Sequence, residues 1–359
     1  MLMLRIRQVK HLAHRLGVTV KVLEKVAEAP ERWCEELVLL DPVKPTKARD
    51  VLNVRGHLRQ LQSRMLRNVL LPALPVSQFS HGGVRRRHIK TNVEPHLESA
   101  FVFTTDISDF YPSINHNRVY RLFAAIFGCS PDVARICTRL YTHDHHLALG
   151  LITSPILADQ LMHRIDERIG RACRKAKLIY TRYVDDLTIS GPYDLETSGF
   201  ADLVQRILEE HGFLLNPDKN RFGRLADGTP ITKIRVNRGH PDVRREYLTE
   251  LERQLADARR LAAGDQFDGP YYTEGQIWGR IQFVCWVNPG RRRTLVRQFR
   301  AIRWDKASEE AKRRGLVAAK KSLARRMPTT ASPAAAIVRT QAESQKGWPQ
   351  VRLQGIPEF

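Results

Sequence analysis

The sequence has little cysteine, no long apolar run and a shortage of acidic residues, and each absence excludes a class of protein. Only five cysteines occur in 359 residues, and no two of them form a Cys-x-x-Cys pair. Neither a disulfide framework nor a cysteine zinc site is therefore expected, and a reducing cytoplasm is the predicted location. No run approaches the ~20 apolar residues of a membrane span, which argues against a membrane protein or a membrane partner. The first residues, MLMLRIR, lack the apolar stretch of a secretory signal.

Positive charge is what the chain has in excess. Lysine and arginine number 59 against 38 aspartates and glutamates, which gives a formal net charge of +21 and an isoelectric point of about 10.2. Solubility is the alternative reason for such charge, but it needs a magnitude of only ~2–8 in a small domain. Because neutralising phosphates releases condensed counterions, a nucleic-acid partner is favoured. The excess is clustered, and we predict RNA contacts from Arg85, Arg86, Arg87, Lys90, Arg291, Arg292 and Arg293.

Length and hydrophobic periodicity predict two or three lobes of mixed helix and strand. Short helices are expected from Arg5 to Leu39, and the pattern from Tyr247 to Arg325 is helical with breaks near 264–275 and at Pro289. The intervening helices are expected over 57–74, 116–127, 131–141, 155–174 and 200–211. Strands are expected within 41–53, 213–238, 101–105, 178–183 and 187–190. The tail 328–359, rich in Pro, Ser, Thr, Gln and Gly, is predicted to be weakly folded or partner-dependent.

Three aspartates stand at the ends of predicted strands. Asp106 ends one apolar strand, while Asp185 and Asp186 form a turn between two others. Adjacent buried carboxylates repel one another, and divalent cations remove that cost. Magnesium prefers oxygen ligands, and two such ions can activate an attacking hydroxyl and stabilise a leaving pyrophosphate. A solvated acidic turn is the alternative reading of the doublet taken alone.

Four blocks of the sequence resemble the motifs of reverse transcriptases, and they occur in that family's order. The blocks are Thr105–Ile114, Gly150–Pro155, Tyr183–Asp186 and Gly212–Lys219. The resemblance covers roughly residues 40–300. It implies an α+β right-hand polymerase with fingers, an antiparallel-sheet palm and a helical thumb, preceded by a small helical N-terminal extension. The expected divisions are extension 1–40, fingers 41–100, palm 101–240 with part of the fingers inserted between its first two motifs, thumb 241–327 and tail 328–359.

The implied reaction is RNA-templated DNA synthesis from deoxynucleoside triphosphates, with two Mg²⁺ ions for which Mn²⁺ is a possible substitute. We expect Asp106 and Asp185 to bridge the ions, Asp186 to support them and Ile107 to offer its backbone carbonyl. In the family, an aromatic ring at the position of Tyr111 excludes the 2′-hydroxyl of a ribonucleotide. The remaining residues predicted to bind the nucleotide are Lys47, Arg49, Gly150, Thr153, Ser154, Pro155 and Lys219.

A finer resemblance points to the retron and related bacterial defence branch. Residues 80–83 and 89–96 look like that branch's insertion motif, which would give Asn92 and His96 a role with RNA. Residues 279–289 are similar to its thumb helix, whereas Lys233 stands where a glycine is usual. The branch implies a dedicated noncoding template RNA, single-stranded DNA that can be RNA-linked, antiphage defence and a separate effector protein.

One departure keeps alternatives open. The family commonly has Gln before the glycine of the second block and Ala-Pro after it, but this chain has Leu149, Leu151 and Ile152. A defence-associated reverse transcriptase that makes untemplated or repetitive DNA is therefore one alternative, and a group II intron-like enzyme is another. A catalytically silent RNA-binding scaffold is the alternative from a different class.

Overall fold

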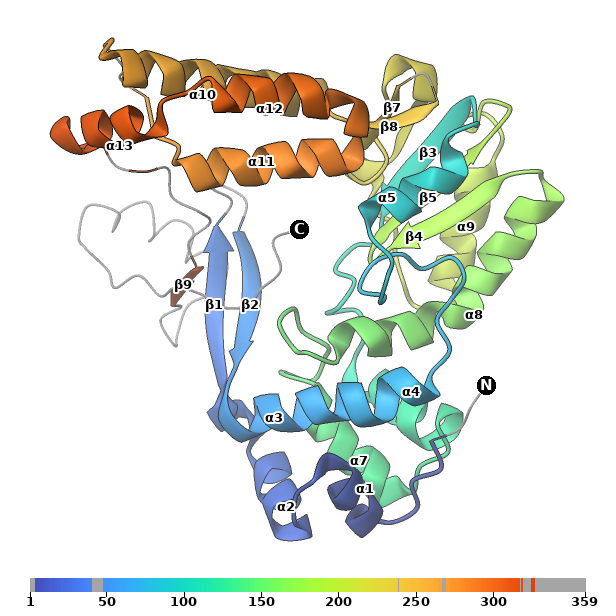
Figure 1. The fold of residues 1–359 in the computed structure, drawn as a ribbon. Coiled ribbons are helices and arrows are strands. Elements are labelled where there is room, and N and C mark those ends of the chain that lie inside the picture. The colour runs from blue at the N-terminus through green and yellow to red at the C-terminus, as the bar shows by residue number, and fades with distance from the viewer. Residues whose placement is uncertain are drawn as a thin grey trace.

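The structure is a computed structural model that describes residues 4–40, 48–237, 239–266, 269–316, 318 and 324–326. Figure 1 shows the helices α10–α13 at one end of the molecule and α1, α2, α3 and α7 at the other, with the sheet that contains β3, β4 and β5 along one side between them. The predicted tail 328–359 lies outside the described residues. No helix in the described ranges is both long and apolar enough to cross a lipid bilayer.

The N-terminal end is a group of amphipathic helices. Its members are α1 (Val9–Leu16), α2 (Val20–Glu28), α3 (Gly56–Met65) and α7 (Pro131–Tyr141). They contact one another in several pairs, and their apolar stripes meet in a core where Leu12, Leu23 and Leu61 are at most 1% exposed. This burial is what holds short helices that would be marginal alone.

Strands β1 (Cys34–Leu40) and β2 (Ala48–Val54) pair antiparallel from Cys34↔Val54 to Leu40↔Ala48. Strand β9 (Ala324–Arg326) pairs with the other edge of β1. Two sequence predictions are wrong here, because the chain from Cys34 to Leu39 was expected to be helical and so was the chain up to Arg325. Both segments contain helix-forming residues, but each finds a pairing partner distant in sequence, and such pairing overrides local propensity.

The central sheet has the order β4-β5-β3-β6, and every pair in it is antiparallel. Its strands are β3 (Phe101–Asp106), β4 (Ile179–Tyr183), β5 (Asp186–Gly191) and β6 (Arg221–Arg224). Side chains alternate between its faces. Phe103 joins the main core with residues of α8 (Ser154–Lys175) and α9 (Phe200–Glu209), whereas Val102 joins the second core. The predicted antiparallel sheet of an α+β fold is confirmed.

The second core lies under the C-terminal helices α10 (Arg245–Ala263), α11 (Glu274–Val287) and α12 (Arg292–Arg300). The hairpin of β7 (Ile234–Asn237) and β8 (His240–Val243) and the short helix α5 (Ile89–Val93) belong to the same cluster. The buried residues of α13 (Trp304–Arg313) form a separate small cluster with Leu261 of α10. The other α-helices among the described residues are α4 (Leu71–Ala73) and α6 (His116–Arg121). The division into fingers, palm and thumb at the expected residues stays a prediction.

Candidate active site

Three carboxylates converge at one end of the central sheet. Asp106 is the last residue of β3, and Asp186, the first of β5, lies opposite it in the antiparallel register. Asp185 immediately precedes Asp186. One carboxylate oxygen of each residue lies within 4.8 Å of the others, and this is the single such group of three or more histidine, cysteine or acidic side chains in the described part of the chain. Strand pairing thus brings together the three aspartates that the sequence singled out.

The acidic turn (Tyr183–Asp186) has two central residues, because Tyr183 pairs with Asp186. Val184 has a φ of 58°, which a β-branched residue rarely adopts. Two hydrogen bonds hold the turn. The Ile107 N–H donates to the Asp185 carbonyl at 3.0 Å, and Nη1 of Arg182 donates to the Val184 carbonyl at 2.9 Å. The backbone of the turn is therefore fixed on both sides of the peptide bond between Val184 and Asp185.

The carboxylates are not fully neutralised by the chain itself. Burial, followed by the charges of Asp185 and Asp106, raises the pKa of Asp186 to about 7. Burial and the charge of Asp106 raise the pKa of Asp185 to about 6, while Lys219 lowers both values. Clustered, partly buried oxygen donors that lack sufficient positive charge are the ligands that a hard divalent cation takes. The residues present therefore fit a magnesium-type site.

Lys219 lies at this site. It ends a short 3-10 turn (Pro217–Lys219), and its Nζ donates to Oδ1 of Asp106 at 2.5 Å. The turn is fixed to the sheet because the Asn216 N–H donates to the Asp106 carbonyl at 2.8 Å. About half of the Lys219 side chain remains exposed. The amine can therefore reach a ligand at the carboxylates, although a role as proton donor stays a prediction.

Tyr111 and Arg49 lie within electrostatic reach of the acidic turn. Burial and then the charge of Asp185 raise the pKa of Tyr111 above its usual range, and the ring is half-buried. The positive charge of Arg49, an exposed residue of β2, lowers the pKa of Asp185. Lys47 lies outside the described residues. The nucleotide contacts of Tyr111, Arg49 and Lys47 stay predictions. The metal contact of the Ile107 carbonyl also stays a prediction.

The block Gly150–Pro155 leads into α8 and packs against β2. The Leu52 N–H donates to the Leu149 carbonyl at 2.8 Å, and Gly150 has a φ of 105°. A Cβ on Gly150 would lie 2.1 Å from the Leu52 carbonyl oxygen, so glycine is required there on two counts. Thr153 and Ser154 are buried, and Pro155 lies in the first turn of α8. The block therefore forms a close junction with β2 at Leu52. Its contacts with a nucleotide stay predictions.

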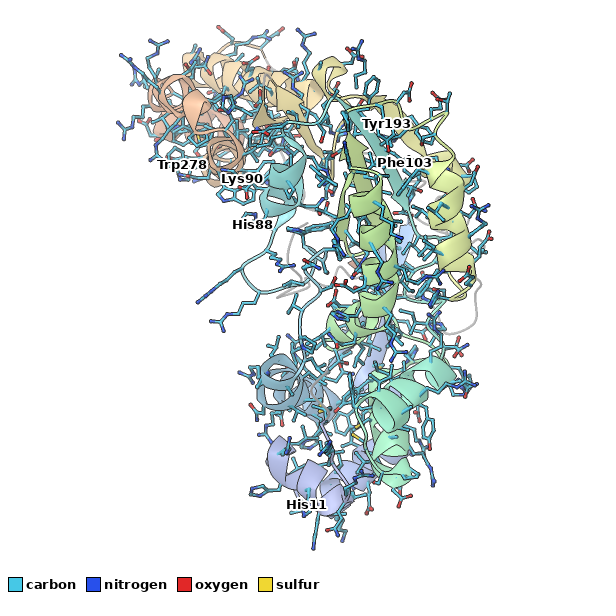
Figure 2. All side chains as sticks on the ribbon, turned by 90° about the vertical axis from the view of Figure 1, so that its right-hand side faces the viewer. His11, His88, Lys90, Phe103, Tyr193 and Trp278 are labelled. Carbon is cyan, nitrogen blue, oxygen red and sulfur yellow. The ribbon has the colours of Figure 1, made fainter. Side chains whose placement is uncertain are left out.

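The predicted RNA-binding residues fall into two groups, of which the first is exposed. Arg85 and Arg86 are exposed, and Lys90 is half-exposed with its Nζ 3.3 Å from the Trp286 carbonyl. The His88 ring packs edge-on against Trp286 with centroids 4.7 Å apart. Figure 2 shows His88 and Lys90 beside the C-terminal helices. Arg292 and Arg293 at the start of α12 are also exposed.

Members of the second group have protein partners. Asn92 is buried and donates from Nδ2 to Oγ1 of Thr232 at 2.9 Å. Both ring nitrogens of buried His96 are hydrogen-bonded, at 2.8 Å to Thr181 and 2.6 Å to Ser190. Arg291 makes a paired contact with buried Asp242, and Arg87 donates to the carbonyls of Ser77, Gln78 and Ser80. These four residues therefore have structural partners within the protein, and their contacts with RNA stay predictions.

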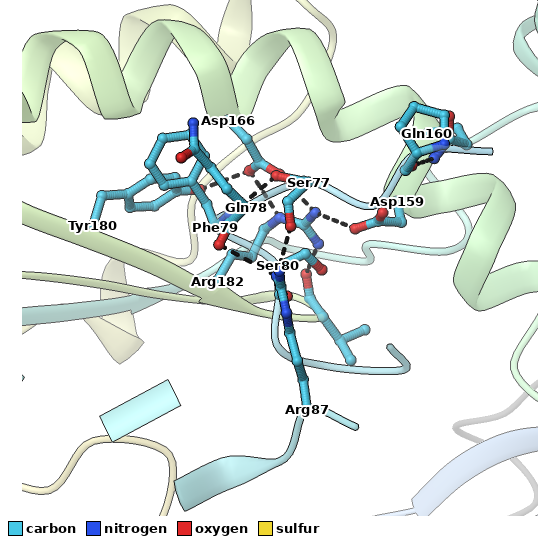
Figure 3. A network of polar contacts seen from close by, with 12 residues as sticks. Ser77, Gln78, Phe79, Ser80, Arg87, Asp159, Gln160, Asp166, Tyr180 and Arg182 are labelled. Carbon is cyan, nitrogen blue, oxygen red and sulfur yellow. Dashed lines mark hydrogen bonds and ion pairs between the residues drawn. The ribbon is translucent and has the colours of Figure 1, made fainter. Parts of the chain in front are cut away.

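Sequence reasoning missed one buried polar cluster behind the acidic turn. Arg182 of β4 is 1% exposed and bonds with Asp159 and Asp166 of α8 (Figure 3). The residue pattern of α8 could have revealed this cluster. Asp159 and Asp166 are seven residues apart, on the same stripe as the apolar Met162 and Ile169. Charged residues on a stripe that faces the core need a partner, here a cation from the sheet.

Comparison with known proteins gives consistent matches. The family described as reverse transcriptase (RNA-dependent DNA polymerase) matches residues 44–248. The retron Mx65 reverse transcriptase of Myxococcus xanthus is 32% identical over 314 residues, covering 81% of this chain and 71% of that protein. The retron Ec86 reverse transcriptase of Escherichia coli is 27% identical over 250 residues, covering 70% and 75%.

Among solved structures, a foamy viral protease-reverse transcriptase in complex with double-stranded DNA is similar with a TM-score of 0.37 and 15% identity, covering 66% of this chain and 33% of that one. The family match and the retron relatives confirm the resemblance inferred from the four sequence blocks, and the right-hand polymerase fold class with it.

Proposed function

Because the chain belongs to the reverse transcriptase family, as an RNA-directed DNA polymerase of the retron type, we propose that it copies a dedicated noncoding RNA into single-stranded DNA. An internal 2′-hydroxyl of that RNA is the proposed primer, which would leave the DNA linked to the RNA. The convergence of Asp106, Asp185 and Asp186 carries the proposal, since nucleotidyl transfer needs clustered carboxylates. A role in antiphage defence with a separate effector protein is part of the same proposal.

In the proposed mechanism the three carboxylates would hold two Mg²⁺ ions, with Mn²⁺ as a substitute. When bound, these ions would promote ionisation of the priming hydroxyl and stabilise charge on the α-phosphate and on pyrophosphate. The hydroxyl oxygen forms a bond to the α-phosphorus as the bond to pyrophosphate breaks. Arg49 would pair with the triphosphate, Tyr111 would exclude a 2′-hydroxyl, and Lys219 would give a proton to the leaving pyrophosphate.

Helix α11 offers a surface that suits the nucleic acid. Its exposed face carries Gly275, Gly279, Gln282 and Trp286, at helical spacing. A Cβ added at either glycine would meet nothing within 4 Å, so the helix backbone is open to close approach. Trp286 packs one edge against His88 and is still 40% exposed, so part of its indole ring is open to stacking by a base. We place the template and its product along this face, close to Lys90.

A second candidate is supported by Leu149, which is 39% exposed where the family commonly has glutamine. Loss of this polar side chain favours an enzyme that makes untemplated or repetitive DNA. Sequencing the nucleic acids that copurify with the protein separates the two. An RNA joined to complementary DNA supports the retron product, whereas DNA without any complementary RNA contradicts it.

The site itself is tested by Asp185→Asn combined with Asp186→Asn. Deoxynucleotide incorporation on a primed RNA should fall by on the order of 10³-fold or more, because metal ligands stabilise the transition state by several kcal/mol. RNA affinity should remain near that of the wild type. Asp202→Asn with Glu209→Gln, an exposed pair on α9, makes the same charge change and serves as control. Unchanged synthesis in the first variant would overturn the site.

A further inference from the structure

A buried guanidinium lies directly behind the acidic turn. Arg182 is 1% exposed, although it immediately precedes the acidic turn of the candidate active site. Side chains alternate along β4, so Tyr180 and Arg182 both face α8. In Figure 3 the Arg182 side chain is surrounded by acidic groups of α8 and by the segment 77–80.

Arg182 uses four of its five N–H donors in a fixed arrangement. Nε and Nη2 donate to the two carboxylate oxygens of Asp166 at 2.9 and 2.8 Å, and Nη2 also donates to Asp159 at 2.8 Å. The Tyr180 hydroxyl donates to Asp166 at 2.9 Å and fixes that carboxylate in turn. Nη1 is left to donate to the Val184 carbonyl at 2.9 Å. The planar fork therefore transmits the position of α8 to the acidic turn.

The backbone of Arg182 makes a second connection. Its N–H donates to the Phe79 carbonyl, and its carbonyl accepts from the His81 N–H, each at 2.7 Å. The next residue of that segment, Gly82, lies against the turn so closely that a Cβ would be 2.5 Å from the Val184 nitrogen. Both the guanidinium and Gly82 therefore contact Val184 of the turn.

Fold stability alone does not account for this cluster. Replacing a buried ion cluster by apolar side chains of similar volume is often neutral or stabilising. An apolar side chain at 182, however, could not donate a hydrogen bond to the turn. The turn needs such a bond because Val184 is held at a φ of 58°, away from the conformations that valine prefers.

We propose that Arg182 is a positioning residue for nucleotidyl transfer: held by Asp159 and Asp166, it fixes the Val184 carbonyl and so the direction of the Asp185 carboxylate. The inference rests on the proposed role of Asp185 at the metal site. A carboxylate that can rotate with its turn would hold the cation less tightly and place the reacting groups less well. A displacement of about 1 Å in an active site can cost about 100-fold in rate.

The test removes the buried charges together, so that none is left unpaired. The variant combines four changes: Arg182→Met, Asp159→Val, Asp166→Val and Tyr180→Phe. Its midpoint of urea unfolding is expected to stay close to that of the wild type. We expect kcat to fall about 100-fold with little change in KM for the primed RNA. The affinity for Mn²⁺, followed by electron paramagnetic resonance with a chain-terminated primer and a matching dNTP, should fall about tenfold.

Controls separate positioning from folding and from the site assignment. Leu23→Ala in the core of α2 lowers stability far from the site and should leave kcat and Mn²⁺ affinity unchanged. If the fourfold variant does not fold, kcat and Mn²⁺ affinity are measured for Arg182→Lys instead. Lysine keeps the positive charge but lacks the planar guanidinium that bonds to α8 and to the turn at once. A folded variant within twofold of the wild type in both readouts overturns the proposal. Loss of activity in the Asp185, Asp186 variant at the same time would show that only the role of Arg182 had failed.

Discussion

Tyr111 is the single side chain on which the choice of sugar is expected to depend. Its ring is half-buried within reach of the Asp185 charge, where a nucleotide sugar would lie in the proposed complex. Tyr111→Ala should raise ribonucleotide incorporation relative to deoxynucleotide incorporation by about tenfold or more, because the steric block is removed. Primer extension with matched dNTP and rNTP measures the ratio. Tyr111→Phe keeps the ring and should keep the wild-type preference; an equal loss of selectivity in both variants would contradict a steric role.

His96 connects the short helix region after α5 to the central sheet and gives stability a pH dependence. Burial and the nearby His81 lower its pKa from 6.5 to about 3. Between these values the unfolded chain binds a proton that the folded chain does not, so the free energy of unfolding falls as pH falls below 6.5. The slope is ~1.4 kcal/mol per pH unit for one such histidine. Urea unfolding between pH 8 and 5 should therefore show a shallower dependence for His96→Gln than for the wild type.

The control for this prediction is His11→Gln, which changes an exposed histidine of α1 labelled in Figure 2. Its pH dependence should match that of the wild type. If His96→Gln kept the full wild-type slope, the buried ring would have to be charged or hydrated in the folded protein.

Residues of the site were predictable from sequence where the signal was local. An apolar strand ending in Asp106 and an acidic doublet between strands mark candidate metal-binding carboxylates, and the resemblance of the blocks around them favours that reading over a solvated turn. Arg182 was not predictable in this way, because its partners Asp159 and Asp166 lie on a helix that precedes it in sequence. The hydrogen bonds of His96 were not predictable for a related reason, since only the tertiary structure reveals that both its ring nitrogens are used.

At the scale of elements, local periodicity predicted helices well and strand pairing poorly. The helix Pro131–Tyr141 has the predicted bounds, and Ser154–Lys175 differs by one residue at each end from the prediction 155–174. Strand β1 was missed because its residues suit a helix and its partner β2 begins after a connection. A strand is stabilised by side-chain pairs with its neighbouring strand, and the periodicity of one segment carries no information about that neighbour.

The junction of β2 with the block before α8 depends on Gly150. Alanine there would have to adopt a φ of 105° and would bring its Cβ within 2.1 Å of the Leu52 carbonyl oxygen. Gly264→Ala is a matched control, because its φ is 87° but nothing lies within 4 Å of the added Cβ. The control should cost ~1–2 kcal/mol in the free energy of unfolding, and Gly150→Ala ~1–3 kcal/mol more. If urea unfolding showed equal losses of unfolding free energy for the two variants, the junction would have to accommodate the added Cβ without strain.

At the scale of the whole molecule, the central sheet joins the two cores. Neighbouring residues of β3 point to opposite faces, so that Phe103 packs with α8 and α9 while Val102 packs with the cluster that includes α11. The end of the same strand carries Asp106. A nucleic acid on α11 and a nucleotide at the acidic turn would therefore be placed relative to one another through a single sheet rather than through a flexible connection.

The net charge of +21 predicts that RNA affinity falls steeply with salt, and the distribution of charge predicts which arginines contribute. Arg85 and Arg86 are exposed without a partner carboxylate among the described ion pairs. Arg85→Gln with Arg86→Gln should lower the slope of log affinity against log salt by about 1.4–1.8, because each lost phosphate contact removes ~0.7–0.9. Filter binding between 50 and 300 mM KCl, conditions chosen around the physiological range of about 150 mM, measures the slope.

Lys21→Gln with Lys25→Gln removes the same charge from exposed positions of α2, at the opposite end of the molecule from the C-terminal helices (Figure 1). An equal decrease in slope for both pairs would mean that RNA responds to total charge and not to a surface at Arg85 and Arg86.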